Sequence, residues 1–276
     1  MIKDIARIMV KSVWQPRLNR CDRPDLPELN ILGTGPSMNN SIGFLQKNKD
    51  AHIMVLNDFA ISRYFTELKP RYYMLIDPVY WKINTHEEGE TERNRLYDCL
   101  INNIEWKMDI FIPSEGYKMG YVKERLKSNH NITVRPVNTY NVKVRVSRLY
   151  FFLLDHNLTT PSQNVLATSL VTALLLGYKN IGLHGAEHSW TEFMRVDDNN
   201  TLCTINKHFY DEPEILKPWI GTNGKPMEIA NILFYLSETF RSYRVIAKYA
   251  ESKHAKIINY TPGSYIDAFQ RQNLRW

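Results

Sequence analysis

A short loop with two glycines follows the first apolar run of the chain and could hold a ligand. The run Glu28–Leu32 suits a buried strand, and it leads directly into Gly33, Thr34, Gly35, Pro36 and Ser37. Glycine allows tight turns and close approach of a ligand, and a serine before a helix can cap that helix or donate to a phosphate. The third glycine of the dinucleotide-binding GxGxxG pattern is absent. The position after the first strand favours ligand binding over a plain strand–helix turn.

Two further apolar runs end in short polar side chains. Asn57 follows His52–Leu56, and Asp77 follows Tyr72–Ile76. The carboxyl ends of parallel strands share one edge of a sheet, so both side chains are predicted to lie near the glycine loop. Capping is the alternative for each of them, because Asn and Asp commonly begin turns and helices.

A strongly apolar helix and the strand after it supply the next candidates. Gln163 and Asn164 open the predicted helix Ser162–Leu176, where free N–H groups favour an anion. The predicted strand Asn180–His184 then leads to a polar and aromatic cluster that contains Gly185, Glu187, His188 and Trp190. Such a cluster is unusual for a bare connecting loop, and we expect it at the same edge of the sheet.

The polar segment 186–226 lacks clear periodicity and is too long for an ordinary connection, which predicts a lid or insertion. It contains His208 and Tyr210, close to Asp211. Histidine is the common general base near neutral pH, and a carboxylate can orient it. A lone histidine is more often structural, but this segment offers no evident core role. No metal site is expected, since Asp197 and Asp198 are adjacent and favour a solvated turn.

Short apolar runs alternate with helical patterns from residue 28 onward. The predicted strands are Glu28–Leu32, His52–Leu56, Tyr72–Ile76, Asp109–Ile112, Ile132–Arg135, Asn180–His184 and Lys256–Asn259. The predicted helices are Asn40–Lys47, Ile61–Leu68, Glu90–Asn103, Lys118–Lys127, Ser162–Leu176, Met227–Glu251 and Ser264–Gln270. This alternation indicates an α/β, Rossmann-like, doubly wound and mostly parallel sheet covered on both faces. Residues 28–276 are interpreted as one catalytic domain that carries the lid segment 186–226.

The charge of the chain is concentrated at its two ends. The 276 residues carry a net charge of +6, and the basic surplus lies within 1–23 and 241–276, so the body between them is mildly acidic. Nucleic-acid binders usually carry the basic stripe through the binding domain, so no nucleic acid is expected as a partner. Residues 1–27 are interpreted as a short basic amphipathic helix and a linker. The helix packs on the domain or contacts an anionic membrane surface, and the first is favoured.

The cysteines and the apolar runs point to the cytoplasm. Cys21, Cys99 and Cys203 are widely spaced, and no pair has the spacing of a zinc site. No apolar run reaches the roughly 18 residues that a membrane span needs. We expect free thiols in a reducing compartment, with a peripheral contact at the inner membrane as the alternative to a freely diffusing protein.

The sequence around these candidates resembles the bacterial sialyltransferase-like superfamily. The loop Gly33–Ser37 resembles the GxGPS loop of that superfamily, and the resemblance extends to Asn57 and to the run from Gln163 through GYKNIGLHGAEHSW. The superfamily includes Campylobacter-type sialyltransferases, flagellin-modifying motility accessory factors and 6-hydroxymethylpterin diphosphokinase MptE-like proteins. The pair GAEHSW and HFYDEP is most similar to a branch associated with surface polysaccharide synthesis. This chain departs from the sialyltransferase pattern at Thr34 and Glu187, where Asn and Asp are usual.

The resemblance implies a Rossmann-like GT-A variant that acts as a metal-independent, inverting glycosyltransferase. The donor would be a CMP-activated sugar of the sialic or nonulosonic-acid type, no cofactor would be required, and the acceptor would be a glycan or a lipid-linked glycan. Carried over by motif, Thr34, Gly35, Ser37 and Asn57 would bind the nucleotide. His208 would take the acceptor proton, and Tyr210 would donate to the departing phosphate. An ATP-dependent pterin diphosphokinase, a non-catalytic nucleotide-binding module and an oligomeric assembly stay open as alternatives.

Overall fold

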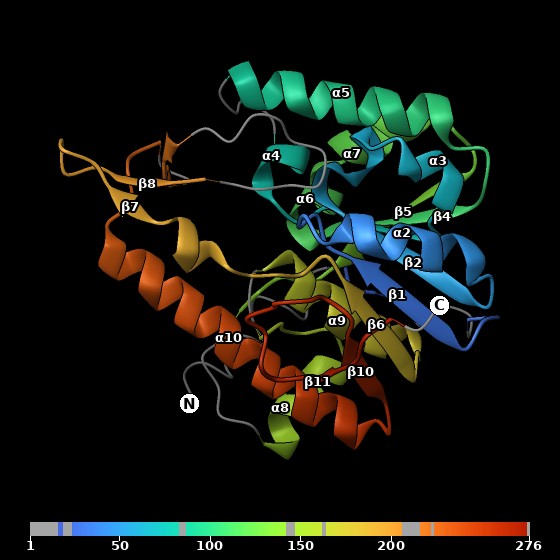
Figure 1. The fold of residues 1–276 in the computed structure, drawn as a ribbon. Coiled ribbons are helices and arrows are strands. Elements are labelled where there is room, and N and C mark those ends of the chain that lie inside the picture. The colour runs from blue at the N-terminus through green and yellow to red at the C-terminus, as the bar shows by residue number, and fades with distance from the viewer. Residues whose placement is uncertain are drawn as a thin grey trace.

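Eight parallel strands form one sheet in the part of the chain that the structure, a computed structural model, describes (Figure 1). That part comprises residues 16–18, 24–82, 87–141, 147–161, 164–205, 216–221 and 224–274. The strands are β1 (Glu28–Leu32), β2 (Ala51–Leu56), β3 (Tyr72–Met74), β4 (Met108–Pro113), β5 (Ile132–Val137), β6 (Asn180–His184), β10 (Lys256–Asn259) and β11 (Gln270–Arg271). Their order in the sheet is β11-β10-β6-β1-β2-β3-β4-β5. The predicted α/β, doubly wound fold is confirmed.

The direction in which the strand order runs reverses at β1. This strand pairs in parallel with β2 on one side and with β6 on the other, with Leu32 opposite Val55 and His184. In open parallel sheets, ligands bind in the crevice outside the carboxyl ends of the strands at such a reversal. The topology therefore marks the ends of β1 and β6 as the place for a site.

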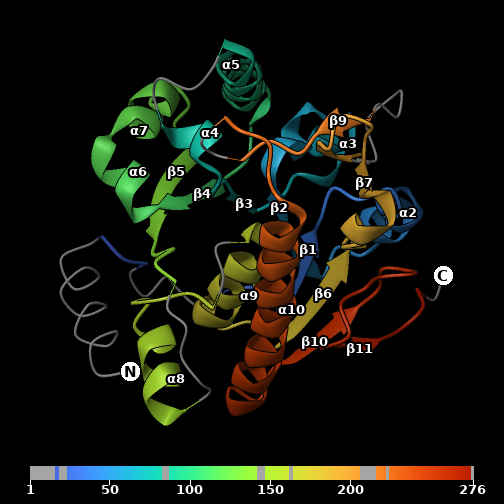
Figure 2. The same cartoon turned by 90° about the vertical axis from the view of Figure 1, so that its left-hand side faces the viewer.

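Helices cover both faces of the sheet (Figures 1 and 2), and the central strands carry apolar residues on both of these faces. One face packs against α8 (Arg148–Asp155), α9 (Val165–Leu176) and α10 (Ile229–Ser252). The other face packs against α2 (Met38–Lys47), the 3-10 turn η1 (Asn57–Ile61), α3 (Tyr64–Leu68), α4 (Pro78–Trp81), α5 (Glu87–Asn103), α6 (Ser114–Met119) and α7 (Tyr121–Leu126). The helix α9 is apolar on all sides and is almost wholly buried between the sheet and α10.

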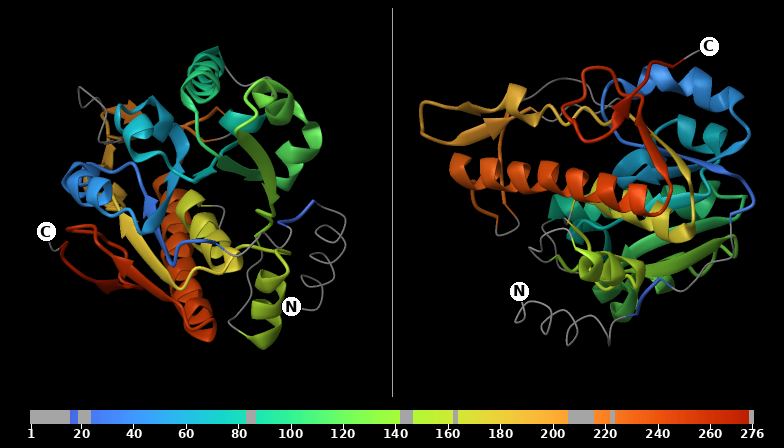
Figure 3. Two further views of the ribbon diagram at one scale, coloured as in Figure 1. Left: turned by 90° about the vertical axis from the view of Figure 1, so that its right-hand side faces the viewer. Right: turned by 90° about the horizontal axis from the view of Figure 1, so that it is seen from below.

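A small antiparallel sheet stands out from the main sheet beside the start of α10 (Figure 3). Its strands are β7 (Arg195–Val196), β8 (Leu202–Thr204) and β9 (Lys217–Pro218), and the 3-10 turn η2 (Trp190–Phe193) leads into it. These strands lie within the segment 186–226, which was predicted as a lid or insertion. The predicted amphipathic helix within residues 1–27 lies outside the described residues.

The prediction of a final helix over Ser264–Gln270 was wrong. Ile266 and Phe269 are both buried, and their spacing of three residues imitates a helical face. The backbone instead bonds elsewhere: the Tyr265 N–H donates to the Glu187 carbonyl over 2.7 Å, and the Ser264 hydroxyl donates to the Ala186 carbonyl over 2.7 Å. These contacts hold the segment as an irregular strap that ends in β11.

Two other predicted helices differ from the structure in extent. The helix predicted over Lys118–Lys127 is divided into α6 and α7 by Gly120, whose φ of 78° lies in the left-handed region that ends helices. The helix predicted over Ile61–Leu68 is only α3, and the chain before it forms η1. The helix α8 was not predicted at all.

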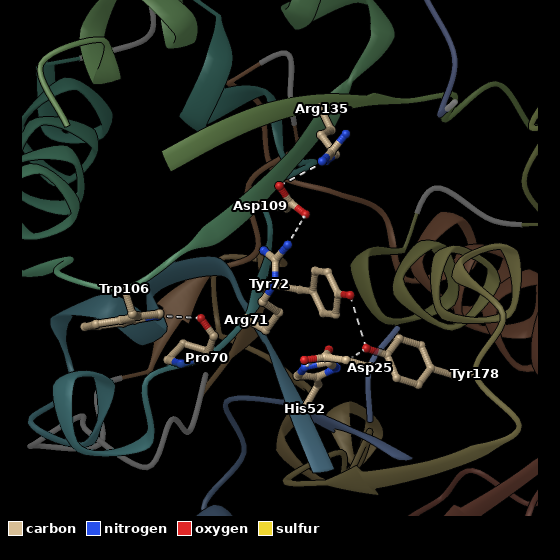
Figure 4. A network of polar contacts seen from close by, with 9 residues as sticks. All are labelled: Asp25, His52, Pro70, Arg71, Tyr72, Trp106, Asp109, Arg135 and Tyr178. Carbon is tan, nitrogen blue, oxygen red and sulfur yellow. Dashed lines mark hydrogen bonds and ion pairs between the residues drawn. The ribbon is translucent and has the colours of Figure 1, made fainter. Parts of the chain in front are cut away.

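A buried carboxylate lies between two arginines near the amino ends of β3 and β4 (Figure 4). This is the edge of the sheet opposite to the carboxyl ends of β1 and β6. The Asp109 carboxylate is 5% exposed, and it pairs with Arg71 and with Arg135 over 3.0 Å each. A hydroxyl network continues beside it, in which Tyr178 donates to Tyr72 over 3.1 Å and also bonds His52. Burial lowers the pKa of His52, and the nearby Asp25 carboxylate opposes that shift.

Replacing Asp109 by Asn is expected to cost about 2 kcal/mol of stability. The change leaves two guanidinium groups without their shared anion, and because each arginine is about a third exposed, solvent screens part of the loss. Urea unfolding at neutral pH measures this cost. Asp98→Asn is the matched control, since Asp98 and Arg125 form an exposed pair over 2.8 Å that is expected to be worth under about 1 kcal/mol. Equal costs for the two variants would contradict this account.

Candidate functional site

A cavity of about 460 Å³ lies at the carboxyl ends of β1, β2 and β6, where the strand order reverses. Its described lining is Gly33–Ser37, Leu56, Asn57, Asn164–Leu166, Gly185–Trp190, Phe193, Ile205 and Pro262. The volume is in the range of pockets that take small molecules and cofactors. The topology and the cavity thus mark the same place independently.

The two loops that follow β1 and β6 are bonded to each other along the floor of this cavity. The Gly33 N–H donates to the His184 carbonyl over 2.8 Å, and the Gly35 N–H donates to the Gly185 carbonyl over 2.9 Å. A Cβ at Gly33 would lie 2.3 Å from the Gly185 carbonyl oxygen. Gly185 itself has a φ of 61°. Gly33 is required because the two loops touch, so that there is no room for a side chain. The sequence suggested only room for a ligand and could not reveal this contact.

Glu187 ties the start of α2 to the loop after β6. Its Oε1 accepts a hydrogen bond from the Ser37 N–H over 2.6 Å, at a helix N-terminus that favours negative charge. The Ser37 hydroxyl does not cap α2. The carboxylate therefore takes the position that a bound anion would otherwise occupy at this helix.

His188 lines the cavity with a strained backbone, and its side chain is hydrogen-bonded to Tyr243 of α10. Its φ is 53°, and its Nε2 lies 3.0 Å from the Tyr243 hydroxyl. That hydroxyl also lies 3.1 Å from Oδ1 of Asn164, which caps α9 by accepting from the Leu166 N–H over 2.9 Å. Burial lowers the pKa of His188 to about 3, so the imidazole is neutral at physiological pH.

Four polar atoms of the cavity lining are buried without a hydrogen-bond partner among the described residues. They are Ser37 Oγ, Asn57 Oδ1, Glu187 Oε2 and His188 Nδ1. An unsatisfied buried polar atom costs roughly 1–3 kcal/mol, so four of them in one cavity are characteristic of a binding site. Asn57, like His188, has a positive φ, of 49°. Backbone strain and unsatisfied atoms thus coincide at two residues of this cavity.

Most of the site residues predicted from the sequence lie together in this cavity. The lining includes Gly33, Thr34, Gly35, Ser37, Asn57, Asn164, Gly185, Glu187 and His188. Asp77 is not part of it: its carboxylate accepts from the Val79 N–H over 3.0 Å and caps α4, as the capping alternative states. Gln163, His208 and Tyr210 lie outside the described residues. Tyr243 was missed, because it lies in an amphipathic helix far along the chain and nothing in its spacing sets it apart.

A second histidine supports the cavity from inside the sheet. His184 is 0% exposed, and its two ring nitrogens lie 3.0 Å from the Ser41 hydroxyl and 3.0 Å from Oδ1 of Asn30. The ring stacks on Tyr260 at 5.0 Å, and burial lowers its pKa to about 3. The set of Ser, His and Asn has the composition of a nucleophilic triad, but its full burial leaves no path for a substrate. We therefore interpret it as structural.

Two general features of the described ranges bear on binding. No three His, Cys, Asp or Glu side chains within them gather as metal ligands would. None of the described helices combines the length and the apolar character needed to cross a lipid bilayer.

Comparison with known proteins places this chain near solved glycosyltransferases at low similarity. No protein-family model matches the sequence, and no curated protein matches it. The structure is similar to the MAf glycosyltransferase from Magnetospirillum magneticum AMB-1, with a TM-score of 0.49 and 14% identity over 98% of this chain and 38% of that one. For the sialyltransferase CstII from Campylobacter jejuni, solved in complex with a substrate analogue, cytidine-5'-monophosphate, the TM-score is 0.45 and the identity is 14%, over 91% of this chain and 86% of that one. For the monofunctional α-2,3-sialyltransferase Cst-I from the same organism, the TM-score is 0.45 and the identity is 12%, over 92% of this chain and 83% of that one. This chain therefore spans well under half the length of the Magnetospirillum protein.

Proposed function

We propose that this protein is a metal-independent, inverting glycosyltransferase that uses a CMP-activated sugar of the sialic or nonulosonic-acid type. One observation carries the proposal: the two segments on which the sequence resemblance rests form one cavity at the reversal of the sheet. They are 150 residues apart at their closest link, the hydrogen bond from the Ser37 N–H to Glu187. A resemblance in two distant segments gains weight when the fold brings both to the place where such sheets bind ligands.

The charge of the cavity supports a nucleoside monophosphate rather than a nucleoside triphosphate. Its described lining contains one carboxylate, Glu187, and no lysine or arginine. A CMP-sugar carries a single phosphodiester charge, which backbone N–H groups and the unpartnered Ser37 hydroxyl of the described lining can offset. ATP carries several charges that usually require cations or a metal ion. This difference disfavours the pterin diphosphokinase alternative.

In the proposed reaction an acceptor hydroxyl oxygen attacks the anomeric carbon from the face opposite the phosphate. The new C–O bond forms as the bond from carbon to the CMP oxygen breaks, and CMP leaves with the electron pair. Thr34, Gly35, Ser37 and Asn57 are proposed to hold the nucleotide. His208 is proposed to receive the acceptor proton, and Tyr210 to donate to the phosphate; both roles rest on the sequence resemblance. The acceptor would be a glycan or a lipid-linked glycan in bacterial surface polysaccharide or glycoconjugate synthesis, made at the cytoplasmic side of the inner membrane.

The test is release of CMP from CMP-sialic acid and related CMP-sugars, with a thermal shift by CMP as the binding measurement. His208→Ala is expected to lower turnover by about 10²–10⁴ and to leave the thermal shift unchanged. Absence of both CMP release and thermal shift would reject the proposal. Turnover of ATP that EDTA abolishes would support the diphosphokinase, and binding of CMP without any turnover would support a binding module.

A further inference from the structure

A chain of hydrogen bonds links the start of α9 to His188 through Tyr243, which is not itself part of the cavity lining. Its first member is Asn164, whose Oδ1 accepts from the N–H groups of Leu166 and Ala167 over 2.9 and 3.3 Å. Backbone N–H groups only donate, so the atom that faces them must be the amide oxygen and not the amide nitrogen. The Asn164 side chain therefore presents an acceptor to Tyr243.

Counting protons along this chain fixes the tautomer of His188. The Tyr243 hydroxyl has one proton and lies 3.1 Å from Oδ1 of Asn164 and 3.0 Å from Nε2 of His188. Donation to Asn164 satisfies the first contact, and the second is then satisfied only if Nε2 carries a hydrogen and donates to the tyrosine oxygen. Donation to Nε2 would instead leave two oxygen acceptors facing each other. Both contacts are hydrogen bonds only when Nε2 is protonated, and in the neutral ring Nδ1 is then bare.

The surroundings of His188 keep the ring neutral and fixed in orientation. Trp190 packs edge-on at 4.2 Å, and Tyr243 and Phe240 pack edge-on at 5.5 and 6.4 Å. Burial lowers the pKa of the ring to about 3, so a second proton does not bind under physiological conditions. The bare Nδ1 is buried and has no partner among the described residues. His188 therefore has two unfavourable features in this cavity: a strained backbone with a φ of 53° and a buried Nδ1 without a hydrogen bond.

We propose that Tyr243 is a positioning residue that holds His188 with its hydrogen on Nε2, so that Nδ1 accepts a hydrogen bond from a hydroxyl or amino group of the bound ligand. Asn57 Oδ1 and Glu187 Oε2 are unsatisfied acceptors of the same cavity. Three acceptors in one cavity suit a ligand rich in O–H and N–H donors, such as a sugar or the sugar of a nucleoside. The identity of that ligand as CMP rests on the proposed function, whereas the tautomer does not.

The free protein tests the tautomer directly. In protein labelled with ¹⁵N at histidine, NMR distinguishes a bare ring nitrogen from a protonated one, and we expect a bare Nδ1 and a protonated Nε2 at His188. Tyr243→Phe removes the hydroxyl and keeps the ring, so the His188 signals should move toward a mixture of the two tautomers. Tyr249→Phe is the matched control, because Tyr249 lies in the same helix, is 0% exposed and bonds Asp155 over 2.5 Å. A protonated Nδ1 in the parent protein would overturn the inference.

Titration with CMP tests the role in binding. Tyr243→Phe is expected to weaken CMP binding by about tenfold, the equivalent of one hydrogen bond, and Tyr249→Phe is expected to leave it unchanged. The Nδ1 signal of the parent protein should shift when CMP binds. CMP that binds without moving this signal would overturn the inference and leave the proposed function standing. A bare Nδ1 in a protein that does not bind CMP would support the positioning role and reject the proposed nucleotide.

Discussion

Lowering the pH from 7 to 5 is expected to destabilise the fold by about 2 kcal/mol through His184 alone. In the unfolded chain this histidine titrates near its ordinary pKa of about 6.5, whereas burial lowers its pKa in the folded protein to about 3. Between these two values the unfolded state binds a proton and the folded state does not, so stability rises with pH. Above pH 6.5, His184 is neutral in both states and folding costs nothing through its titration. As the pH falls from 6.5 to 3, the free energy of unfolding decreases, because only the unfolded state binds the proton. His188, whose pKa is lowered in the same way, adds a loss in the same direction.

Urea unfolding at pH 7 and pH 5 measures this effect as the difference between the two free energies of unfolding. His184→Gln should reduce that difference by about 2 kcal/mol, because the titrating group is gone. Leu170→Ala, at a wholly buried apolar position of α9, is the control. It should cost about 3 kcal/mol equally at both pH values. An unchanged pH dependence in His184→Gln would show that His184 is not the group responsible.

The strands of the main sheet were predictable because parallel strands buried on both faces consist of continuous apolar runs. Runs such as HIMVL in β2 and NIGLH in β6 contain this signal in a few residues, and turn-forming residues delimit them. The strands β7 and β9 have two residues each and pair in an antiparallel sheet, which is too short for any periodicity. The small sheet could therefore not be predicted from the pattern.

The cavity was predictable to the extent that its residues directly follow strands. Gly33, Asn57 and Glu187 each come within a few residues of a strand end, so the doubly wound topology alone brings them to one edge. Tyr243 reaches the same place from the middle of α10, and only the packing of α10 against α9 determines this. Asp77 also follows a strand, but its carboxylate turns to its own helix, a local choice that spacing does not encode.

Replacing Gly33 by Ala is expected to cost about 3 kcal/mol and to abolish ligand binding in the cavity. The added methyl group would lie 2.3 Å from the Gly185 carbonyl oxygen, 2.9 Å from its carbon and 3.3 Å from the His184 carbonyl oxygen. All three are backbone atoms, so the loops after β1 and β6 must separate, and the hydrogen bond from Gly33 to His184 is lost with them. Urea unfolding and the thermal shift by CMP measure the two consequences. Gly120→Ala is the control. A Cβ there meets nothing within 4 Å, so its only cost is the strain of a residue other than glycine at a φ of 78°.

Gly35→Ala tests the contact between the glycine loop and the Glu187 side chain. Its methyl group would lie 1.6 Å from Oε2 of Glu187, the end of a flexible side chain that can move away, and 2.8 Å from the Gly185 carbonyl oxygen, a backbone atom. Moving it breaks the bond to the Ser37 N–H, a loss of about 2 kcal/mol. Because Glu187→Ala removes both the clash with the Glu187 side chain and that bond, its cost and that of Gly35→Ala should combine to less than their sum. Gly120→Ala and Glu187→Ala should instead add, since a Cβ at Gly120 meets nothing within 4 Å. Additivity in both pairs would contradict the assignment of Glu187 as the strut between α2 and the loop after β6.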